Sequence, residues 1–331
     1  MKRILITGCS GYLGSMVVRL LAERGGWEIF GIDVQRPQDE SAYAGFAQAS
    51  VTDSRAMAAI FEQARPDVAV HLAFVVDVTH NPRREEDIAI GGTRNFLEGV
   101  RQSGAPKAVL VTSVAAYGAH EDNDVPLTES SPIRGNAGYS YSRLKAAVDD
   151  IARAFMNDHQ ECEFAILRPC LFVGAHTRNH FFDLLKFPIV PRVMDFKGVR
   201  DPLFQFIHED DMARCLVAAI EKPARGIYNV AAEGEQPFSK LVRLTGKRSL
   251  PLPWFLLYPA TALLWALRLV TSPPAQLYFI RYPWIMDVSR MRRDLYVPVM
   301  NGIDAFKEFV EKQINKDSNI RKENMRLGVI D

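Results

Sequence analysis

The chain has 331 residues, of which 48% are hydrophobic, so it is long enough to bury a large core in about two domains. Lys and Arg (40 residues) nearly balance Asp and Glu (39 residues), which excludes the positive field that a nucleic-acid partner requires. Its four cysteines, at positions 9, 162, 170 and 215, show neither metal-ligand spacing nor a paired framework. We therefore expect no metal and a reducing, cytoplasmic compartment.

The first half of the sequence alternates short apolar runs with segments of helical periodicity. We expect strands at RILIT, EIFGID, DVAVHLA, KAVLVTS and EFAILRP, and helices from about Tyr12, over 54–63, over 93–102 and over 141–155. Strands that alternate with helices pair in parallel through right-handed crossovers. The sequence therefore predicts an α/β fold with a doubly wound parallel sheet.

Three glycines follow the first predicted strand in TGCSGYLG and precede the first predicted helix. Gly8 would permit a tight turn, Gly11 a close approach of the backbone to a ligand, and Gly14 close packing of helix and strand. Free amide groups and the positive dipole end of a helix at Tyr12 suit a pyrophosphate. This context predicts a dinucleotide site, with a plain turn as the alternative.

Asp33 ends the second predicted strand, nineteen positions after Gly14. An acidic side chain at this place accepts both ribose hydroxyls and repels a 2′-phosphate, so NAD is favoured over NADP as the cofactor. Arg36 lies close by in the sequence and could bind a phosphate, which keeps NADP as the alternative.

Tyr141 and Lys145 are four residues apart in a predicted helix, so their side chains lie on one face. An ammonium near a phenol favours the phenolate and lowers the tyrosine pKa from about 10 toward neutral pH. Tyr141 is therefore the predicted proton carrier. Tyr and Lys at this spacing also occur on many solvated helix faces. The order of the motifs along the chain favours a catalytic role instead.

These motifs, taken in order, resemble the extended short-chain dehydrogenase/reductases of the NAD-dependent epimerase/dehydratase family. The loop TGCSGYLG resembles the family's TGxxGxxG, VAVHLA its third strand, LVTSVAAYG its serine strand, and YSRLK its YxxxK. LRPCLFVG, FIHEDDMA and IYNVA resemble later segments of the family. The resemblance covers residues 1–232 and only faintly the rest.

The resemblance implies a Rossmann-like fold, a set of site residues and a homodimer built on the helix of Tyr141 and the helix before it. Ser113 would hydrogen-bond the substrate oxygen, Tyr141 would carry the proton, and Lys145 would also contact the nicotinamide ribose. His71 and His208 match the family as supporting or capping residues. The implied cofactor-binding residues are Gly8, Ser10, Gly11, Tyr12, Leu13, Gly14, Asp33, Leu72, Ala73, Tyr141, Lys145 and Pro169.

The same resemblance suggests how the chain is divided. Residues 1–169 would form the NAD-binding domain, to which 203–232 would return. Residues 170–202 and 233–315, rich in proline and aromatic residues, would form a smaller C-terminal substrate-binding or lid region. The charged residues 316–331 have little to bury and are expected to form a solvated tail.

Several positions depart from the family pattern. Ala89 and Ser50 stand where many relatives carry an asparagine and an adenine-contacting aspartate. Relatives that act on nucleotide sugars tend to hold the diphosphate with an asparagine and an arginine, and this chain has Leu171 and Phe204 there. A buried diphosphate without charged donors is poorly held.

Other residues bear on the same choice of substrate. Arg192, Lys197 and Arg200 lie nearby in the sequence and could replace the missing donors. LRPCLFVG and the apolar segment 254–270 look more like the 3β-hydroxysteroid dehydrogenase and flavonol-type reductase branches. We therefore expect an apolar, sterol-like small-molecule substrate ahead of a nucleotide sugar.

Residues 249–267 carry no charge and approach membrane-spanning length, but three prolines interrupt them. An apolar lid or core helix is the favoured interpretation, and a membrane-surface or inserted segment through 254–270 is the alternative. The apolar run at the N-terminus is too short for a secretory signal, so export is not expected.

The leading hypothesis is an NAD-dependent oxidoreductase that moves a hydride between a secondary alcohol or ketone and nicotinamide, with Ser113, Tyr141 and Lys145 as catalytic residues. The first alternative is a nucleotide-sugar epimerase or dehydratase that uses the same residues and a retained NAD. The second is a non-catalytic dinucleotide-binding sensor or scaffold, because a fold alone does not establish a function.

Overall fold

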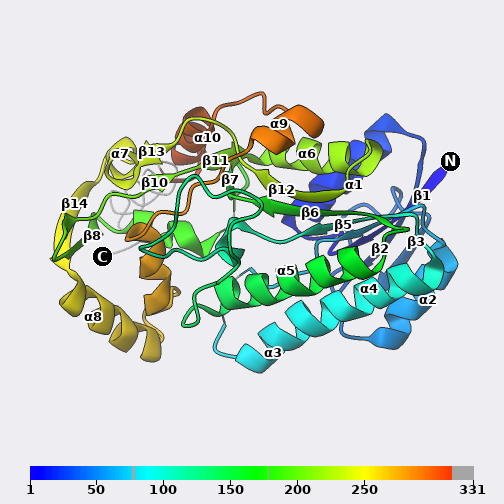
Figure 1. Ribbon diagram of the computed structural model, residues 1–331, viewed down its shortest axis with the longest axis horizontal. Helices are drawn as coiled ribbons and strands as arrows, with labels where there is room; N and C mark the ends of the chain where they lie inside the picture. Colours follow the sequence, from blue (N-terminus) through cyan, green and yellow to red (C-terminus); the bar gives the residue numbers. More distant parts are fainter. Residues whose placement is uncertain (77–78, 178, 315–331) are drawn as a thin grey trace, which may run out of the picture.

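A seven-stranded parallel sheet forms the centre of the molecule (Figure 1). The structure is a computed structural model that describes residues 1–76, 79–177 and 179–314, so the predicted tail at 316–331 lies outside the described residues. The strand order is β12-β6-β5-β4-β1-β2-β3. The strands are β1 (Lys2–Thr7), β2 (Trp27–Asp33), β3 (Gly45–Gln48), β4 (Val68–His71), β5 (Lys107–Val111), β6 (Glu163–Pro169) and β12 (Gly226–Val230).

Helices cover both faces of this sheet, which confirms the predicted doubly wound α/β fold (Figure 1). One face carries α1 (Tyr12–Arg24) and α6 (Glu209–Glu221). The other carries α2 (Ser54–Ala64), α4 (Gly92–Ser103) and α5 (Ser140–Asp158), with α3 (Pro82–Glu86) and the π-turn η1 (Asp87–Gly91) leading into α4. The bounds of α2, α4 and α5 lie within three residues of the predicted ones, and α1 begins at Tyr12 as predicted.

The central strands carry apolar runs because they are buried on both sides. In β1, Ile4 and Ile6 pack into the core beneath α1 and α6, whereas Leu5 packs into the core beneath α2, α4 and α5. Successive side chains of a strand point to opposite faces, so one run of apolar residues serves both cores.

The strand order reverses between β1 and β4. The chain runs outward from β1 to β2 and β3, then returns to place β4 on the other side of β1. The loops that follow β1 and β4 therefore diverge and open a crevice at the carboxyl ends of these strands, where ligands of such sheets bind.

A smaller C-terminal region, at the left of Figure 1, packs beyond these strand ends. Short strands here pair across long stretches of sequence: β7 (Leu171–Val173) with β11 (Phe206–His208), and β10 (Leu203–Phe204) with β13 (Gln236–Pro237). β8 (Ile189–Asp195) lies between β14 (Arg248–Pro253) and β9 (Gly198–Val199). The remaining elements are η2 (Val114–Ala116), η3 (His180–Lys186), α7 (Phe238–Leu244), α8 (Trp254–Ala266), η4 (Pro274–Ile280), α9 (Ser289–Asp294), α10 (Gly302–Phe309) and η5 (Val310–Ile314).

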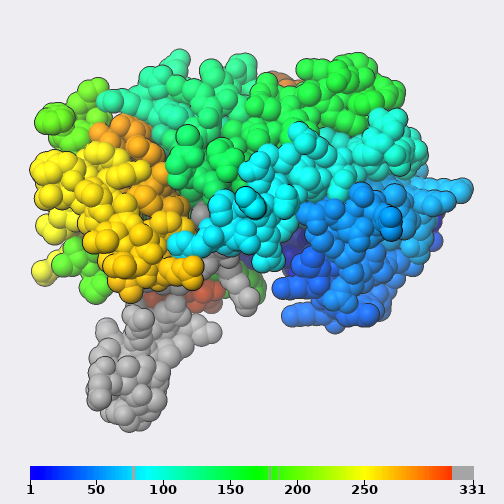
Figure 2. Space-filling model, turned by 90° about the horizontal axis from the view of Figure 1, so that it is seen from below, coloured from blue at the N-terminus to red at the C-terminus, as the bar shows by residue number. Residues whose placement is uncertain are grey.

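The uncharged segment 249–267 forms most of β14 and all of α8. Among the thirteen residues of α8 only Leu257 is buried, so a core helix is wrong as an interpretation of this segment. Figure 2 shows α8 beside residues 79–86, where the His80 ring stacks on Trp265 with centroids 4.2 Å apart. Of the helices that the structure describes, none is both long enough and apolar enough to cross a membrane.

Candidate active site

The glycine loop between β1 and α1 has the geometry of an anion cradle. Gly8 has a φ of +70°, and a Cβ at this residue would lie 2.7 Å from the Ala73 amide nitrogen. A Cβ on Gly14 would lie 2.1 Å from the Gly8 carbonyl oxygen, so the close packing of α1 requires glycine. Gly11 caps α1 with no side-chain hydrogen bond in the described residues, which leaves its first amide groups free for a pyrophosphate.

Tyr12, the first residue of α1, is held in place from the C-terminal region. Its ring stacks on Phe172 with centroids 5.6 Å apart, and its hydroxyl donates a hydrogen bond to Glu209 at the start of α6. Glu209 is buried and also accepts hydrogen bonds from His176. The beginning of α1 is therefore fixed by residues that the sequence did not point to.

Asp33 lies at the end of β2 beside the glycine loop. Its carboxylate accepts hydrogen bonds of 3.0 Å from the backbone amides of Ser10 and Gln35. The Arg36 guanidinium is engaged elsewhere, because it donates to Glu40 at 2.8 Å and to Gln48 at 3.1 Å. Asp33 therefore stands where the ribose is expected to bind. Arg36, which could bind a phosphate, is already paired with Glu40 and Gln48.

Ser113, Tyr141 and Lys145 come together at the crevice. Ser113 follows β5 and lies beside Tyr141, which stands in the first turn of α5, in the lining of one cavity. One turn later, the Lys145 ammonium donates to the Val111 carbonyl oxygen at 3.3 Å. The same nitrogen lies 3.7 Å from the centre of the Phe74 ring, a cation–π contact.

The electrostatics of this group differ from the expectation. Burial lowers the pKa of Lys145 to about 7, against the raising effect of the Asp149 carboxylate. Burial raises the pKa of Tyr141 above its ordinary value, against the lowering effect of the Ser113 hydrogen bond. The ammonium is 5.9 Å from the Tyr141 ring centroid and faces Phe74, so the expected lowering of the tyrosine pKa by Lys145 is wrong for this structure.

One cavity of about 220 Å³ collects most of the predicted site residues. Its lining includes Gly8, Gly11, Tyr12, Leu13, Gly14, Leu72, Ser113, Tyr141, Lys145 and Pro169. The other three predicted residues adjoin it: Ser10 and Asp33 through their mutual hydrogen bond, and Ala73 through its backbone against Gly8. We call this space the catalytic cavity.

Sequence reasoning missed the aromatic side of the catalytic cavity. Phe74, Phe181, Phe279 and Trp284 line it together with the predicted residues. Phe74 directly follows the third predicted strand motif, so the rule that strand ends carry site residues would have found it. The other three come from distant C-terminal segments that no local pattern connects to the site.

Neither His71 nor His208 is in the described lining of this cavity, and of the four cysteines only Cys170 is. His71 is buried between Thr7, at 2.7 Å, and Thr93, at 3.3 Å, and His208 caps α6 by accepting from the Asp210 amide. All four cysteines are free and buried, and burial raises the pKa of the Cys9 thiol to about 11, which suits a small filler. Across the described residues, no His, Cys, Asp and Glu cluster could hold a metal ion.

The positions expected to hold a substrate diphosphate are apolar, and the nearby cations are paired. Phe204 is buried among aromatic rings that include Phe181 and Trp284. The three cations that could replace the missing donors form ion pairs instead: Arg192 with Asp201, Lys197 with Glu121, and Arg200 with Asp195 and Glu121. Lys145 is the one Lys or Arg in the described lining of the catalytic cavity, and Arg178 lies outside the described residues.

Curated proteins are similar to this chain in sequence. The chain is 23% identical over 320 residues to an uncharacterised protein, Rv0501, of Mycobacterium tuberculosis, covering 93% of this chain and 83% of the relative. It is 30% identical over 260 residues to UDP-glucose 4-epimerase 2 of Arabidopsis thaliana, covering 67% of this chain and 72% of the relative.

Solved structures share the fold of this chain. The UDP-glucose-4-epimerase of Stenotrophomonas maltophila with bound NAD and formylated UDP-arabinopyranose aligns with a TM-score of 0.70 at 19% identity, covering 98% of this chain and 100% of that one. The model of the NAD dependent epimerase/dehydratase family matches residues 4–231. The chain therefore belongs to the NAD dependent epimerase/dehydratase family, a family of NAD-dependent enzymes.

Proposed function

We propose that this protein is an NAD-dependent oxidoreductase that moves a hydride between a secondary alcohol carbon and C4 of nicotinamide. The observation that carries the proposal is the meeting of Ser113, Tyr141 and Lys145 in the cavity that the glycine loop also lines. The family match and the NAD in a solved relative support the choice of cofactor.

Ser113, Tyr141 and Lys145 have different roles in the proposed reaction. When bound, the nicotinamide supplies the hydride acceptor or donor, and the protein supplies geometry and proton transfer. Ser113 holds the substrate oxygen beside the Tyr141 phenol, with which it shares the cavity lining. Tyr141 takes the hydroxyl proton during oxidation and returns it during reduction. Lys145, fixed by the Val111 carbonyl oxygen, holds the nicotinamide ribose.

NAD fits this site better than NADP. The Asp33 carboxylate faces the glycine loop, where it would accept the ribose hydroxyls and repel a 2′-phosphate. The Arg36 guanidinium, the side chain closest in sequence that could neutralise such a phosphate, is paired with Glu40.

The polarity of the site favours an apolar alcohol or ketone as the substrate. Phe74, Phe181, Phe279 and Trp284 surround the substrate end of the catalytic cavity with rings. The described residues there offer a diphosphate no arginine, and a buried diphosphate needs charged donors. A sterol-like or similarly apolar substrate is therefore the finer form of the proposal.

Nucleotide-sugar epimerisation with a retained NAD is the second candidate function. The specific observation in its favour is the 30% identity to a plant UDP-glucose 4-epimerase. In both reactions an alcohol carbon is oxidised, for which a bound nicotinamide would accept the hydride and Tyr141 would take the hydroxyl proton, with Ser113 and Lys145 in the same roles. The non-catalytic sensor has no such support, because a binding protein has no need of Ser113, Tyr141 and Lys145 gathered in one cavity.

Three further expectations stay proposals. We propose a homodimer through α4 and α5, which lie side by side on one face of the sheet (Figure 1). We propose that residues 254–270 touch a membrane surface, since α8 carries no charge and exposes Phe255 and Leu263. The cytoplasmic location is supported by four cysteines that are all free.

The first test is the cofactor content of the protein as purified. The protein is passed through gel filtration without added nucleotide and denatured, and the released dinucleotide is quantified by chromatography. Little bound nucleotide, with NAD binding restored on addition, supports an enzyme that exchanges its cofactor in each turnover. Near-stoichiometric NAD supports the epimerase instead. Failure to bind either NAD or NADP would contradict both.

A further inference from the structure

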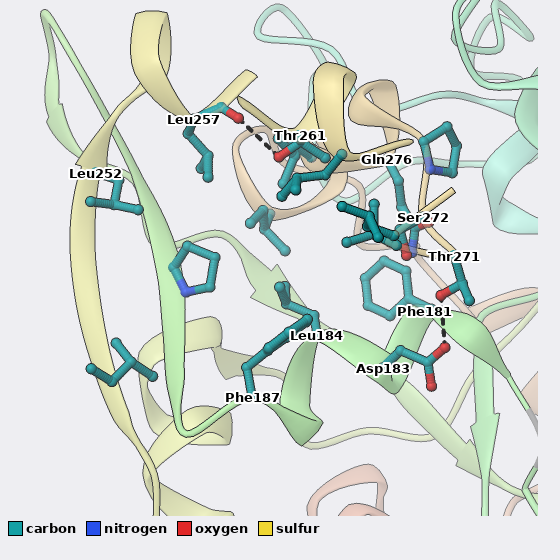
Figure 3. A pocket seen from close by; sticks show the side chains of 18 of the residues that line it. Phe181, Asp183, Leu184, Phe187, Leu252, Leu257, Thr261, Thr271, Ser272 and Gln276 are labelled. Carbon is teal, nitrogen blue, oxygen red and sulfur yellow. Dashed lines mark hydrogen bonds between the residues drawn. The ribbon is translucent and has the colours of Figure 1, made fainter. Parts of the chain in front are cut away.

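A second cavity, of about 480 Å³, lies in the C-terminal region beneath α8 (Figure 3). Its walls come from β8, β14, η3, α8 and η4, and we call it the α8 cavity. Its described lining consists mainly of leucine, isoleucine, valine, phenylalanine and proline, with Leu184, Leu252 and Leu257 among them. A pocket of this size and composition suits an apolar ligand.

Three of the polar side chains in the lining are already paired within the protein, and Ser272 and Gln276 are the other polar residues there. The Thr261 hydroxyl donates to the Leu257 carbonyl oxygen at 2.9 Å, and the Thr271 hydroxyl donates to the Asp183 carboxylate at 2.9 Å, as Figure 3 shows. A polar ligand would lose its hydration here without gaining these donors. The α8 cavity therefore selects hydrocarbon.

One layer of side chains separates the α8 cavity from the catalytic cavity. Phe181 lines both. In η4, Phe279 lines the catalytic cavity, whereas Leu277 and Ile280 line the α8 cavity. The two cavities therefore adjoin across the Phe181 ring, which must turn aside for one molecule to occupy both.

The α8 cavity also has an apolar mouth. Leu264 and Leu269 line it and are 40% and 68% exposed. Apolar side chains exposed at the rim of an apolar cavity give a hydrocarbon chain a continuous surface along which to enter. The mouth and the shared Phe181 wall mark the two ends of the α8 cavity.

We propose that the α8 cavity binds the hydrocarbon tail of the substrate whose alcohol carbon reacts at Tyr141. The substrate class is an amphipathic long-chain or polycyclic secondary alcohol, or the matching ketone. The proposal rests on the proposed function, and it adds the place and the chemistry of the tail. Each methylene that enters the cavity strengthens binding, because it leaves water for an apolar wall.

A displacement experiment tests the cavity without turnover. The fluorescent apolar probe N-phenyl-1-naphthylamine is bound to the NAD-loaded protein and displaced by 2-alkanones of increasing chain length. We expect the displacing concentration to fall roughly fourfold with each added methylene until the cavity is filled. A flat dependence on chain length would overturn the inference.

Three variants test whether the ketones bind in the α8 cavity. Leu252→Trp fills the α8 cavity and should weaken displacement by the longest ketone at least about tenfold, the loss of two or more methylene contacts. Leu203→Trp, at an exposed position of β10 outside both cavities, is the matched control and should behave as wild type. Leu264→Asp places a charge at the half-exposed mouth, so it still tests the proposal should the overfilled variant fold poorly. Equal displacement in all three variants would contradict the assignment.

A turnover series separates this inference from the proposed function. With NAD and 2-alkanols, we expect kcat/KM to rise with chain length in the wild type and in Leu203→Trp, and to lose that rise in Leu252→Trp. Turnover without any dependence on chain length overturns the inference and leaves the proposed function standing. Displacement that depends on chain length, without turnover of any alcohol, retains the hydrocarbon site and rejects the proposed function.

Discussion

Arg168 donates two hydrogen bonds to Asp149, of 2.6 and 2.8 Å, and both side chains are fully buried. The pair lies directly behind the catalytic cavity, because Asp149 follows Lys145 by one turn of α5 and Arg168 precedes Pro169 in β6. The Arg168 guanidinium also donates to the Tyr117 hydroxyl at 2.7 Å. The ion pair therefore joins β6, whose last residue Pro169 lines the cavity, to α5, which carries Tyr141 and Lys145.

Breaking this pair should cost stability. Asp149→Asn leaves the Arg168 guanidinium buried without its counter-charge, so we expect the free energy of unfolding to fall by about 3–5 kcal/mol. Urea unfolding followed by tryptophan fluorescence measures the change. Asp150→Asn, at the exposed neighbouring position, is the control and should change stability by less than about 0.5 kcal/mol. Similar values for the two variants would show that the buried charge is not needed.

The glycine loop gives a steric prediction. In Gly14→Ala the new Cβ would meet the Gly8 carbonyl oxygen, so α1 must move away from β1, and we expect a loss of roughly 1–3 kcal/mol together with weaker NAD binding. Calorimetric titration with NAD and thermal melts measure both effects. Gly91→Ala adds a Cβ that meets no described atom within 4 Å, in a helical conformation, and should be neutral or slightly stabilising. NAD affinity equal in the two variants would contradict the cradle.

The sequence predicted the sheet, and the structure brings Ser113, Tyr141 and Lys145 together in one cavity. The strands of the sheet carry apolar runs, and Tyr141 and Lys145 share a helix, so short-range patterns were enough for these features. Ser113 and the glycine loop stand at strand ends, and the ends of parallel strands meet at one edge of the sheet.

Other features depend on contacts that no local pattern encodes. β8 and β14 pair although more than fifty residues separate them in the sequence, and Phe181 meets Trp284 across about a hundred residues. The position of the Lys145 ammonium is another such feature, because it faces the Phe74 ring and not the Tyr141 ring. Helical spacing predicted that Tyr141 and Lys145 share a face, but packing decides how far apart their polar groups lie.

The pKa of Tyr141 predicts how the reaction depends on pH. Because burial raises this pKa, the phenolate is a minor form at neutral pH, and oxidation of an alcohol should accelerate up to about tenfold for each pH unit between about pH 6 and pH 9. Reduction uses the phenol and should change little over this range. Steady-state kcat/KM in both directions gives the two profiles, and oxidation that is independent of pH would contradict the role of Tyr141 as base.

Removing the phenol hydroxyl tests the same residue directly. Tyr141→Phe deletes the proton carrier but leaves the cradle intact, so we expect turnover to disappear while NAD binds with nearly unchanged affinity. Tyr228→Phe removes a hydroxyl from β12, outside the catalytic cavity, and is the control for general damage. A Tyr141→Phe variant with a normal rate would remove this residue from the mechanism.

Protonation of His71 should lower the free energy of unfolding in acid. Burial, and then the charge of Lys145, lower its pKa to about 3, whereas an unfolded histidine titrates at about 6.5. The unfolded state therefore binds the proton first, so this stability is present above about pH 6.5 and is lost as the pH falls toward 3, at up to about 1.4 kcal/mol per unit. Melting temperatures at neutral and mildly acidic pH should differ less in His71→Asn than in the wild type. His159→Asn, near the surface, should keep the wild-type difference.

The outer face of α8 predicts binding to lipid. Phe255 and Leu263 are 70% and 61% exposed, the helix carries no charge, and Arg268 follows it. Apolar side chains flanked by a basic residue suit an anionic bilayer surface. We expect the protein to sediment with phosphatidylglycerol vesicles, and Leu263→Glu to lose most of this binding, because it places a charge among the lipid chains. Val299→Glu adds the same charge at an exposed site outside α8 and should still sediment. Equal sedimentation of the two variants would place lipid contact elsewhere on the molecule.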